Sequence, residues 1–290
     1  MKFDVIAGNP PYQTKSDADD RKTQAIWPDF VKQAFNLVAE NGYVCLVHPS
    51  GWREVDGMFK DIQELILSKD IKYLELHDRA DGVRMFGVQT TYDWYVAQNK
   101  SAGTNTTVKG QDGCAISMDI STVSFIPNGM FDEVYELVAK DGEDKIVIAR
   151  DASNYHTQKE WMRDAKDERH PYPCVYSTLK DGTIKCWYSD TNNDGHFGVP
   201  KVIFTDGTSH PIIDSKGKYG LTQFAYAVVD APENLPLIQK ALLTEKFIKL
   251  MDTCQFRGKH RYNRKVIATF RKDFWKQFVD SNGNELTVNL

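Results

Sequence analysis

The first hundred residues combine short apolar runs with stretches in which apolar residues recur at helical spacing. Runs rich in Val, Ile or Leu predict buried strands around Val5-Ile6 and over residues 43–47, 71–76 and 90–97. Apolar residues three or four positions apart predict amphipathic helices over residues 26–40 and 54–69. The resulting order is strand, helix, strand, helix, strand, strand, which predicts an α/β fold.

The amino-acid composition of the chain changes near residue 100. Residues 99–113 are polar and rich in Ser, Thr, Asn and Gly, which is typical of a linker. We therefore expect one domain over residues 1–100 and a second, of α+β type, over residues 101–290. The elements expected in the second domain are a strand pair at 118–126, a helix at 130–140, a hairpin at 172–188, strands at 199–204 and 221–229, and helices at 235–254 and 270–279.

The loop Asn9-Pro10-Pro11-Tyr12 ends the first strand. Proline removes a backbone donor and fixes its own φ angle, so this loop is rigid and leaves carbonyl groups free to accept hydrogen bonds. An amide oxygen and a free carbonyl suit the amine of a planar base, and an aromatic ring offers a stacking face. A plain strand-terminating turn is the alternative, but this motif directly after an apolar strand favours a base pocket.

The stretch from Asp4 to Tyr12 resembles motif IV of the amino-group DNA methyltransferases, in the Asn-Pro-Pro-Tyr form that methylates adenine N6. The resemblance implies S-adenosylmethionine as the methyl donor and double-stranded DNA as the substrate. It also implies that the Asn9 side chain and the Pro10 carbonyl accept from the amine of a flipped adenine. In this resemblance Pro11 completes the loop and Tyr12 stacks on the base.

Two further resemblances extend along the chain. Met85-Phe86-Gly87 is similar to motif VIII of the same family, which makes Phe86 a second stacking candidate with Trp52 behind it; core packing is the alternative for Phe86. The order of the first elements resembles the second half of the family's Rossmann-like sheet. Residues 101–290 resemble, more loosely, the target-recognition part that follows it.

The Gly-rich strand end that holds the cofactor in this family has no counterpart before Phe3 or around Asp280. We therefore expect the chain to carry the catalytic and recognition parts only, and to bind S-adenosylmethionine weakly or not at all by itself. Either a partner supplies the cofactor half of a split enzyme, or the chain is a non-catalytic DNA-binding or protein-interaction module of restriction-modification or anti-restriction systems. A partner subunit, a homo-oligomer or the chain's own C-terminal helices would also cover the apolar sheet edge at Val5-Ile6.

The charge distribution restricts where DNA can bind. The net charge is −4, so contact with DNA has to come from a local basic patch. Five of the nine residues from 257 to 265 are basic, and their charges attract phosphates through counterion release. A solvated basic loop is the alternative interpretation. The candidate DNA-binding residues are Arg257, Lys259, Arg261, Arg264 and Lys265.

The remaining sequence features argue against several kinds of site. The five cysteines are scattered without a Cys-x-x-Cys pair, which argues against a disulfide framework or a zinc site and indicates a reducing, cytoplasmic compartment. No apolar run approaches a membrane-spanning length. His48 and His77 each end a strand, but they lack a nucleophile or carboxylate at a recognisable spacing. We expect both to be structural, and the charged stretch from Asp78 to Arg84 to be a solvated loop.

Overall fold

The structure is a computed structural model that describes residues 2–14, 24–205, 210–256 and 262–286. These residues form two compact units. The first holds the described residues up to Phe131 together with Phe256, and the second holds those from Asp132 to Gln255 and from Tyr262 onward. The sequence places a boundary near residue 100, whereas the first unit continues for some thirty residues more. The assignment of separate roles to residues 1–100 and 101–290 stays a prediction.

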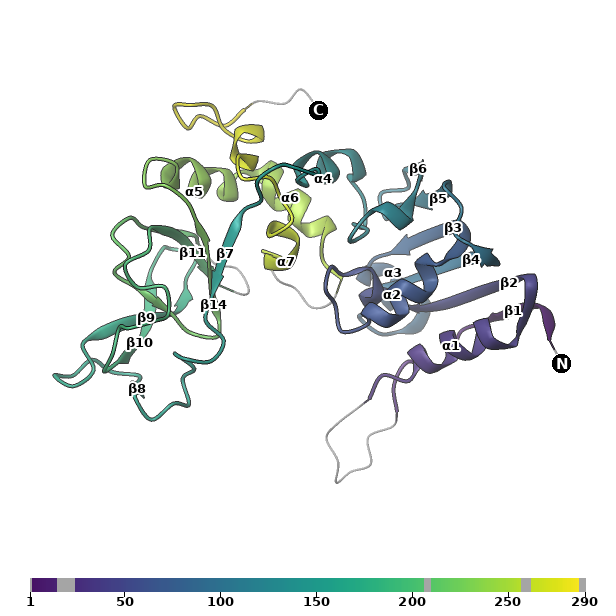
Figure 1. The fold of residues 1–290 in the computed structure, drawn as a ribbon, viewed down its shortest axis with the longest axis horizontal. Helices are drawn as coiled ribbons and strands as arrows, with labels where there is room; N and C mark the ends of the chain where they lie inside the picture. Colours follow the sequence, from purple (N-terminus) through teal and green to yellow (C-terminus); the bar gives the residue numbers. More distant parts are fainter. Residues whose placement is uncertain (1, 15–23, 206–209, 257–261, 287–290) are drawn as a thin grey trace. The chain divides into compact units, whose positions relative to one another are not determined.

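The first unit is built on a mixed sheet with the strand order β1-β2-β4-β3-β5-β6 (Figure 1). Strand β1 runs parallel to β2, β4 is antiparallel to both β2 and β3, and β5 runs parallel to β3. The α/β class predicted from the sequence is therefore observed. The strands are β1 (Phe3–Gly8), β2 (Val38–Pro49), β3 (Lys69–His77), β4 (Tyr92–Ser101), β5 (Thr106–Lys109) and β6 (Ala115–Met118).

Strand β1 lies at an edge of this sheet, and β2 is its one neighbour among the described strands. Phe3 is 46% exposed and Val5 is 58% exposed. The expectation that the run around Val5-Ile6 is a buried strand is therefore wrong. An apolar side chain is buried only when another element packs over it. Phe3 and Val5 lie on an edge strand that the described elements leave partly uncovered.

Residues that the sequence assigns to a linker instead extend the sheet. Thr106–Lys109 pairs with β3 and with β6, and Val108 is fully buried. The β-branched residues Thr106, Thr107 and Val108 suit a pleated strand, and this propensity prevails over the polar composition of the surrounding segment.

Two helices, α1 (Trp27–Leu37) and α2 (Lys60–Leu67), pack beside each other against the sheet (Figure 1). Helix α2 begins later than its pattern predicts because Asp56 adopts a positive φ angle in the turn before it. The charged stretch expected to be a loop forms a third helix, α3 (Arg79–Phe86). The Asp78 side chain caps its first turn and Gly87 ends it with a φ of 72°.

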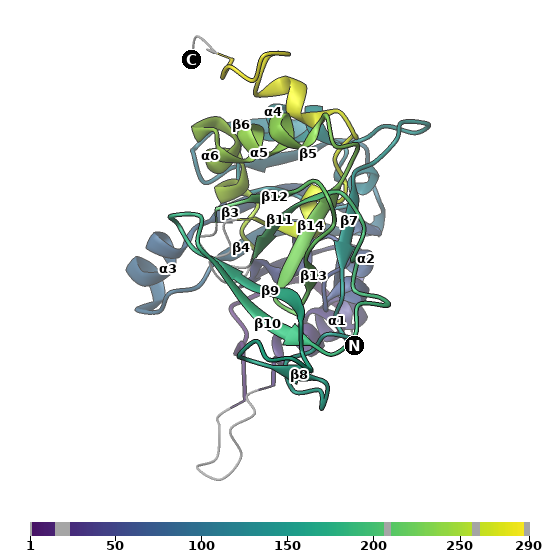
Figure 2. The ribbon, with the colours of Figure 1, turned by 90° about the vertical axis from the view of Figure 1, so that its left-hand side faces the viewer.

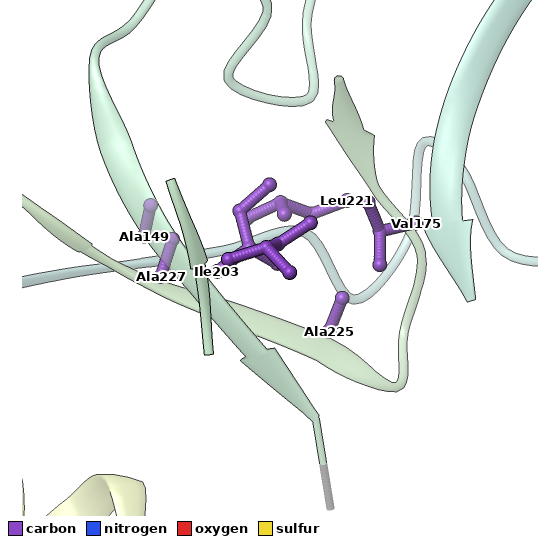
Figure 3. Close-up of a cluster of buried hydrophobic side chains, with 7 residues drawn as sticks. Ala149, Val175, Ile203, Leu221, Ala225 and Ala227 are labelled. Atoms are coloured by element: carbon purple, nitrogen blue, oxygen red, sulfur yellow. The ribbon is translucent and has the colours of Figure 1, made fainter. Parts of the chain in front are cut away.

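The second unit contains two four-stranded sheets, ordered β13-β9-β10-β8 and β12-β11-β14-β7 (Figure 2). Small and branched side chains from both sheets form one core that includes Ala149, Val175, Ile203, Leu221 and Ala227 (Figure 3). The strands are β7 (Val147–Arg150), β8 (Met162–Arg163), β9 (Tyr172–Thr178), β10 (Ile184–Ser189), β11 (Lys201–Thr205), β12 (Ile212–Asp214), β13 (Gly220–Leu221) and β14 (Ala225–Val229). The hairpin expected over residues 172–188 is confirmed as β9 and β10.

The helices of the second unit depart from the sequence pattern at two places. Helix α4 (Phe131–Leu137) lies where a helix is expected, but residues 235–254 form two helices, α5 (Leu235–Leu243) and α6 (Glu245–Thr253). Thr244 separates them, because its hydroxyl caps α6 by accepting from the Phe247 amide. The helix expected at 270–279 is only a 3-10 turn, η3 (Phe274–Gln277), preceded by the short helix α7 (Arg264–Ile267).

Two more turns, η1 (Ser50–Arg53) and η2 (Ile120–Thr122), lie in the first unit, and η2 and β6 replace the strand pair expected at 118–126. Among the residues that the structure describes, every helix is too short or too polar to traverse a lipid bilayer.

Candidate functional site

The Asn9-Pro10-Pro11-Tyr12 loop lies at the edge of the sheet where β1 and β2 both end. Gly8 pairs with Leu46, so the loop continues alongside the last residues of β2. The end of β2 at Pro49 pairs with Tyr92, and Tyr92 in turn pairs with His77 at the end of β3. Ligands of α/β sheets bind at this edge, beyond the carboxyl ends of the strands.

The loop is anchored by a buried proline and a backbone hydrogen bond, and its other residues are exposed to solvent. Pro10 is buried, whereas Asn9 and Pro11 are exposed. After the loop the backbone forms a short antiparallel pairing, in which the Ile26 amide donates to the Tyr12 carbonyl at 3.1 Å. The exposed Asn9 amide is therefore available to a ligand, while the backbone behind it is fixed.

Tyr12 is half-buried, and its hydroxyl is a buried group without a hydrogen-bond partner among the described residues. Burial raises the pKa of Tyr12 to about 12, with smaller contributions from Tyr92 and Asp93. The phenol therefore stays neutral at physiological pH. Its ring can serve as a stacking surface, but its oxygen is no base.

Four rings form a continuous series at this edge. The Tyr12 and Phe86 centroids lie 6.3 Å apart in an edge-to-face arrangement, and Phe86 lies 4.9 Å from Tyr92 in the same manner. The rings of Tyr92 and His77 are stacked at 4.4 Å. The structure thus brings together Tyr12 and Phe86, the two residues that the sequence selects for base stacking.

Helix α3 places Phe86 beside the loop, and Gly82 allows that helix to lie close to the chain before β4. A Cβ atom at Gly82 would come within 2.1 Å of the Thr90 carbonyl oxygen. Only a glycine permits this approach between the two backbones. The position of Phe86 therefore depends on a residue that an amphipathic pattern does not reveal.

His77 has carboxylate partners, contrary to the expectation from the sequence. Its Nδ1 lies 2.8 Å from an Asp81 carboxylate oxygen, and Asp81 also accepts from Arg84 at 2.6 Å. The Nε2 atom lies 3.5 Å from Glu75. The four-residue spacing of His77 and Asp81 is typical of one helical turn, but it carries information only once helix α3 is recognised.

His48 and Trp52 belong to the core. His48 is fully buried and stacks on Trp27 with centroids 4.5 Å apart. Burial, with a smaller contribution from Arg53, lowers the pKa of His48 to about 4 against the opposing effect of the hydrogen bond to the Pro49 carbonyl. Trp52 is 1% exposed and donates from its indole to Asp93 at 3.0 Å, so its suggested place behind Phe86 as a stacking residue is wrong.

A buried ion pair lies beneath this edge. Arg53 donates to both carboxylate oxygens of Asp93, at 2.7 and 3.0 Å, and both side chains are fully buried. Burial raises the pKa of Asp93, and the guanidinium opposes that shift. Arg53 also donates to the Ile126 carbonyl at 2.5 Å and to Asn128 at 2.7 Å. Four of its five N–H groups thus have acceptors inside the unit.

Most of the basic stretch expected to bind DNA, including Arg257, Lys259 and Arg261, lies outside the described residues. Arg264 lies over the Tyr226 ring at 5.0 Å from its centroid. Tyr262, within the same stretch, is 1% exposed and donates to the Leu242 carbonyl, so it belongs to the core of the second unit. DNA binding by the cluster, Lys265 included, stays a prediction.

The described residues do not fit S-adenosylmethionine. A site of the expected kind needs a Gly-rich turn after one strand and an acidic residue after the next. Among the described strands, β2 is the only neighbour of β1, and its end carries Pro49 and Ser50 without such a turn.

Residues 1–86 match the model of the Eco57I restriction-modification methylase family. These residues are similar to a restriction-modification methylase. The match includes the loop at Asn9–Tyr12 and reaches Phe86. It confirms the resemblance to a DNA methyltransferase that the sequence of the loop indicates. Whether the chain holds only the C-terminal part of such a domain stays a prediction.

One relative is described as adenine-specific. The chain is 30% identical over 176 residues to a Mycoplasma pneumoniae protein (strain ATCC 29342 / M129 / Subtype 1) described as an uncharacterized adenine-specific methylase. The match covers 56% of this chain and 41% of that protein, so the chain spans less than half of the relative's length.

Solved structures with a weaker likeness come from restriction-modification systems. The type IIL restriction-modification enzyme MmeI, solved with DNA, is 11% identical, with 91% of this chain and 46% of that chain covered at a TM-score of 0.45. The M protein of the type I restriction enzyme EcoKI is 12% identical, with 49% and 36% covered at a TM-score of 0.30.

Proposed function

We propose that this chain is a component of a site-specific DNA adenine-N6 methyltransferase that receives a flipped adenine at Asn9-Pro10-Pro11-Tyr12. The observation that carries the proposal is the pairing of Tyr12 with Phe86 beside the exposed Asn9 amide. Residues separated by more than seventy positions thus supply two aromatic faces and one acceptor at the end of the same sheet. The methylase match over residues 1–86 supports this assignment.

The chemistry follows from the electronic structure of the amine. The exocyclic nitrogen of adenine is a poor nucleophile because its lone pair is delocalised into the ring. Hydrogen bonds from the amine to the Asn9 oxygen and the Pro10 carbonyl favour the tetrahedral nitrogen that forms as the methyl group arrives. Tyr12 and Phe86 hold the ring so that this nitrogen is aligned for transfer. The methylated nitrogen then releases one of its protons to solvent, so no deprotonation by Tyr12 is required.

S-adenosylmethionine supplies the methyl group in this proposal, and other residues hold it because those described here do not fit it. We assign that role to a partner that pairs with the exposed edge of β1. Among the described strands only β2 pairs with β1, so the other edge of β1 offers backbone groups beside Phe3 and Val5 that a strand from a partner subunit or a second copy would cover. The second unit, with the basic stretch from Arg257 to Lys265, would contact duplex DNA.

Transfer of labelled methyl groups to duplex DNA tests the proposal, with the chain alone and with candidate partners. Asn9→Ala is expected to lower the rate by at least about 100-fold, because an acceptor for the developing charge is lost. Asn36→Ala is the matched control, since Asn36 is an exposed amide on α1 away from the loop.

The two variants separate the outcomes. Loss of methylation by Asn9→Ala with retained DNA binding supports the enzyme. Equal rates for both variants contradict the role of the loop. DNA binding without methylation in any mixture favours the non-catalytic module instead. A calorimetric titration in which the chain alone binds S-adenosylmethionine with micromolar affinity would remove the need for a partner.

A further inference from the structure

A second hollow lies at the edge of the sheet that carries the loop. It has a volume of about 210 Å³, and its lining includes Pro49, Phe59, Arg79, Gln89, Thr91 and Phe256. Tyr12 and Phe86 do not line it, so it is separate from the proposed adenine pocket. Pockets for drug-sized ligands typically have roughly 300–1,000 Å³. This open cavity is therefore too small for a drug-sized ligand but suits one nucleotide base, with the sugar and phosphate at its mouth.

The wall of the cavity is continuous with the aromatic series at the loop. Thr91 lines the cavity and is followed by Tyr92, whose ring lies 4.9 Å from Phe86. Pro49, on the same wall, pairs directly with Tyr92 across the sheet. The two sites therefore lie on adjacent residues of one edge, so one strand of nucleic acid can occupy both.

One wall is rigid because its polar groups are already bonded to one another. The Ser50 and Thr91 hydroxyls lie 2.6 Å apart, and both lie 3.0 Å from the Phe256 carbonyl oxygen, so one hydroxyl can donate to the other while the second donates to the carbonyl. The Ser50 amide donates to the Thr91 carbonyl at 3.3 Å. These bonds fix the shape of the wall and leave recognition to other side chains.

Two polar side chains of the lining are free to bind a ligand. Within the described part of the chain, neither the Arg79 guanidinium nor the Gln89 amide has a hydrogen bond or ion pair. A guanidinium matches the geometry of a phosphate. An amide offers one donor and one acceptor, which match the N6 and N7 positions of adenine. The half-buried Phe59 ring adds an aromatic surface on which a base can stack.

We propose that this cavity binds one nucleotide adjacent to the target adenine on the same strand, an inference that rests on the proposed function. The phosphate binds Arg79, the base lies against Phe59, and Gln89 bonds to the base edge with a preference for adenine. The first unit then reads part of the recognition sequence itself, in addition to holding the target base. Sequence recognition is divided between the two units.

Binding of deoxynucleoside monophosphates to the full chain tests this inference without requiring methylation. Saturation-transfer NMR with dAMP, dGMP, dCMP and dTMP is expected to show binding, with dAMP preferred. Arg79→Ala should weaken dAMP binding at least about tenfold, because a charged hydrogen bond is lost. Arg84→Ala is the matched control. It removes the same charge from the same helix, where Arg84 is 72% exposed and pairs with Asp81 outside the cavity. Gln89→Ala should remove the preference for dAMP.

Asn9→Ala separates this site from the proposed adenine pocket, since dAMP could bind either. The inference predicts that Asn9→Ala keeps the Arg79-dependent binding even if methylation fails. Binding lost in Asn9→Ala and kept in Arg79→Ala would overturn it while supporting the proposed function. Equal weakening by Arg79→Ala and Arg84→Ala would overturn it as well. So would the absence of binding at millimolar concentration, or displacement of dAMP by an equal concentration of inorganic phosphate.

Discussion

Protonation of His48 is expected to destabilise the first unit as the pH falls. The ring has no exposed surface, its Nδ1 donates to the Pro49 carbonyl at 3.1 Å, and its Nε2 has no partner among the described residues. A proton on Nε2 would place a charge between Trp27 and Tyr95, where no acceptor among the described side chains compensates it. The neutral ring is therefore strongly favoured in the folded state.

The magnitude follows from the shift in pKa. The folded-state pKa of His48 is about 4, against an ordinary value of 6.5. Each unit corresponds to about 1.4 kcal/mol, so the full difference is about 3 kcal/mol. The unfolded chain binds the proton more tightly. The stabilisation is therefore present above pH 6.5 and is lost as the pH falls towards 4. Between pH 7 and pH 5 the loss is about 2 kcal/mol.

Urea unfolding at pH 7 and pH 5, followed for the unaltered chain and His48→Phe, measures this loss. Phenylalanine keeps a ring against Trp27 without a titrating nitrogen, so the unaltered chain should lose about 2 kcal/mol more than the variant. His156→Phe, a half-buried histidine in the second unit, is the control. An NMR titration in which His48 protonates near pH 6.5 would refute the reasoning, as would equal pH dependence of the two proteins.

Three substitutions test other parts of the first unit. Asp93→Asn leaves the buried Arg53 charge without its counterion and should lower the free energy of unfolding by about 3–5 kcal/mol in urea titrations; a change below 1 kcal/mol would show that the pair is dispensable. Gly82→Ala forces a Cβ into the Thr90 carbonyl, so its thermal midpoint should fall by several degrees, and an unchanged midpoint would contradict the close approach. Tyr12→Phe removes a buried hydroxyl that has no partner among the described residues. The free energy of unfolding should therefore stay the same or rise by up to about 1 kcal/mol. A clear fall in the free energy of unfolding would contradict the absence of a hydrogen bond to this hydroxyl.

The central strands were predictable because each is a short apolar run bounded by turn residues. The exposure of β1 could not be predicted. Whether Val5 is exposed depends on which elements lie beside it and not on its own apolar side chain. Helix α3 was not predicted because its sequence contains Gly82 and several charged residues and has no apolar residues at helical spacing. The signals for its ends were nevertheless present in Asp78 and Gly87, which cap it.

The candidate site shows the same division between local and long-range information. The loop at Asn9–Tyr12 is a contiguous motif, so its chemistry could be inferred from four residues. The positions of Tyr92 and His77 beside Phe86 follow from strand register across β2, β4 and β3, which no local pattern contains. Arg79 and Gln89 line a cavity only because of that register and because α3 approaches β4 closely.

The four hydrogen bonds that Arg53 donates have a practical consequence for dividing the protein into fragments. Two of its hydrogen bonds go to Ile126 and Asn128, beyond the residue near 100 at which the sequence suggests a cut. A fragment ending there would keep the bonds to Asp93 but would lose the acceptor of Nη1 and one of the two acceptors of Nη2. Such a truncation should yield insoluble material, whereas one extended through Phe131 keeps every acceptor. The point at which the chain can be cut is therefore set by the acceptors of an arginine in a turn and not by the last strand of the predicted domain.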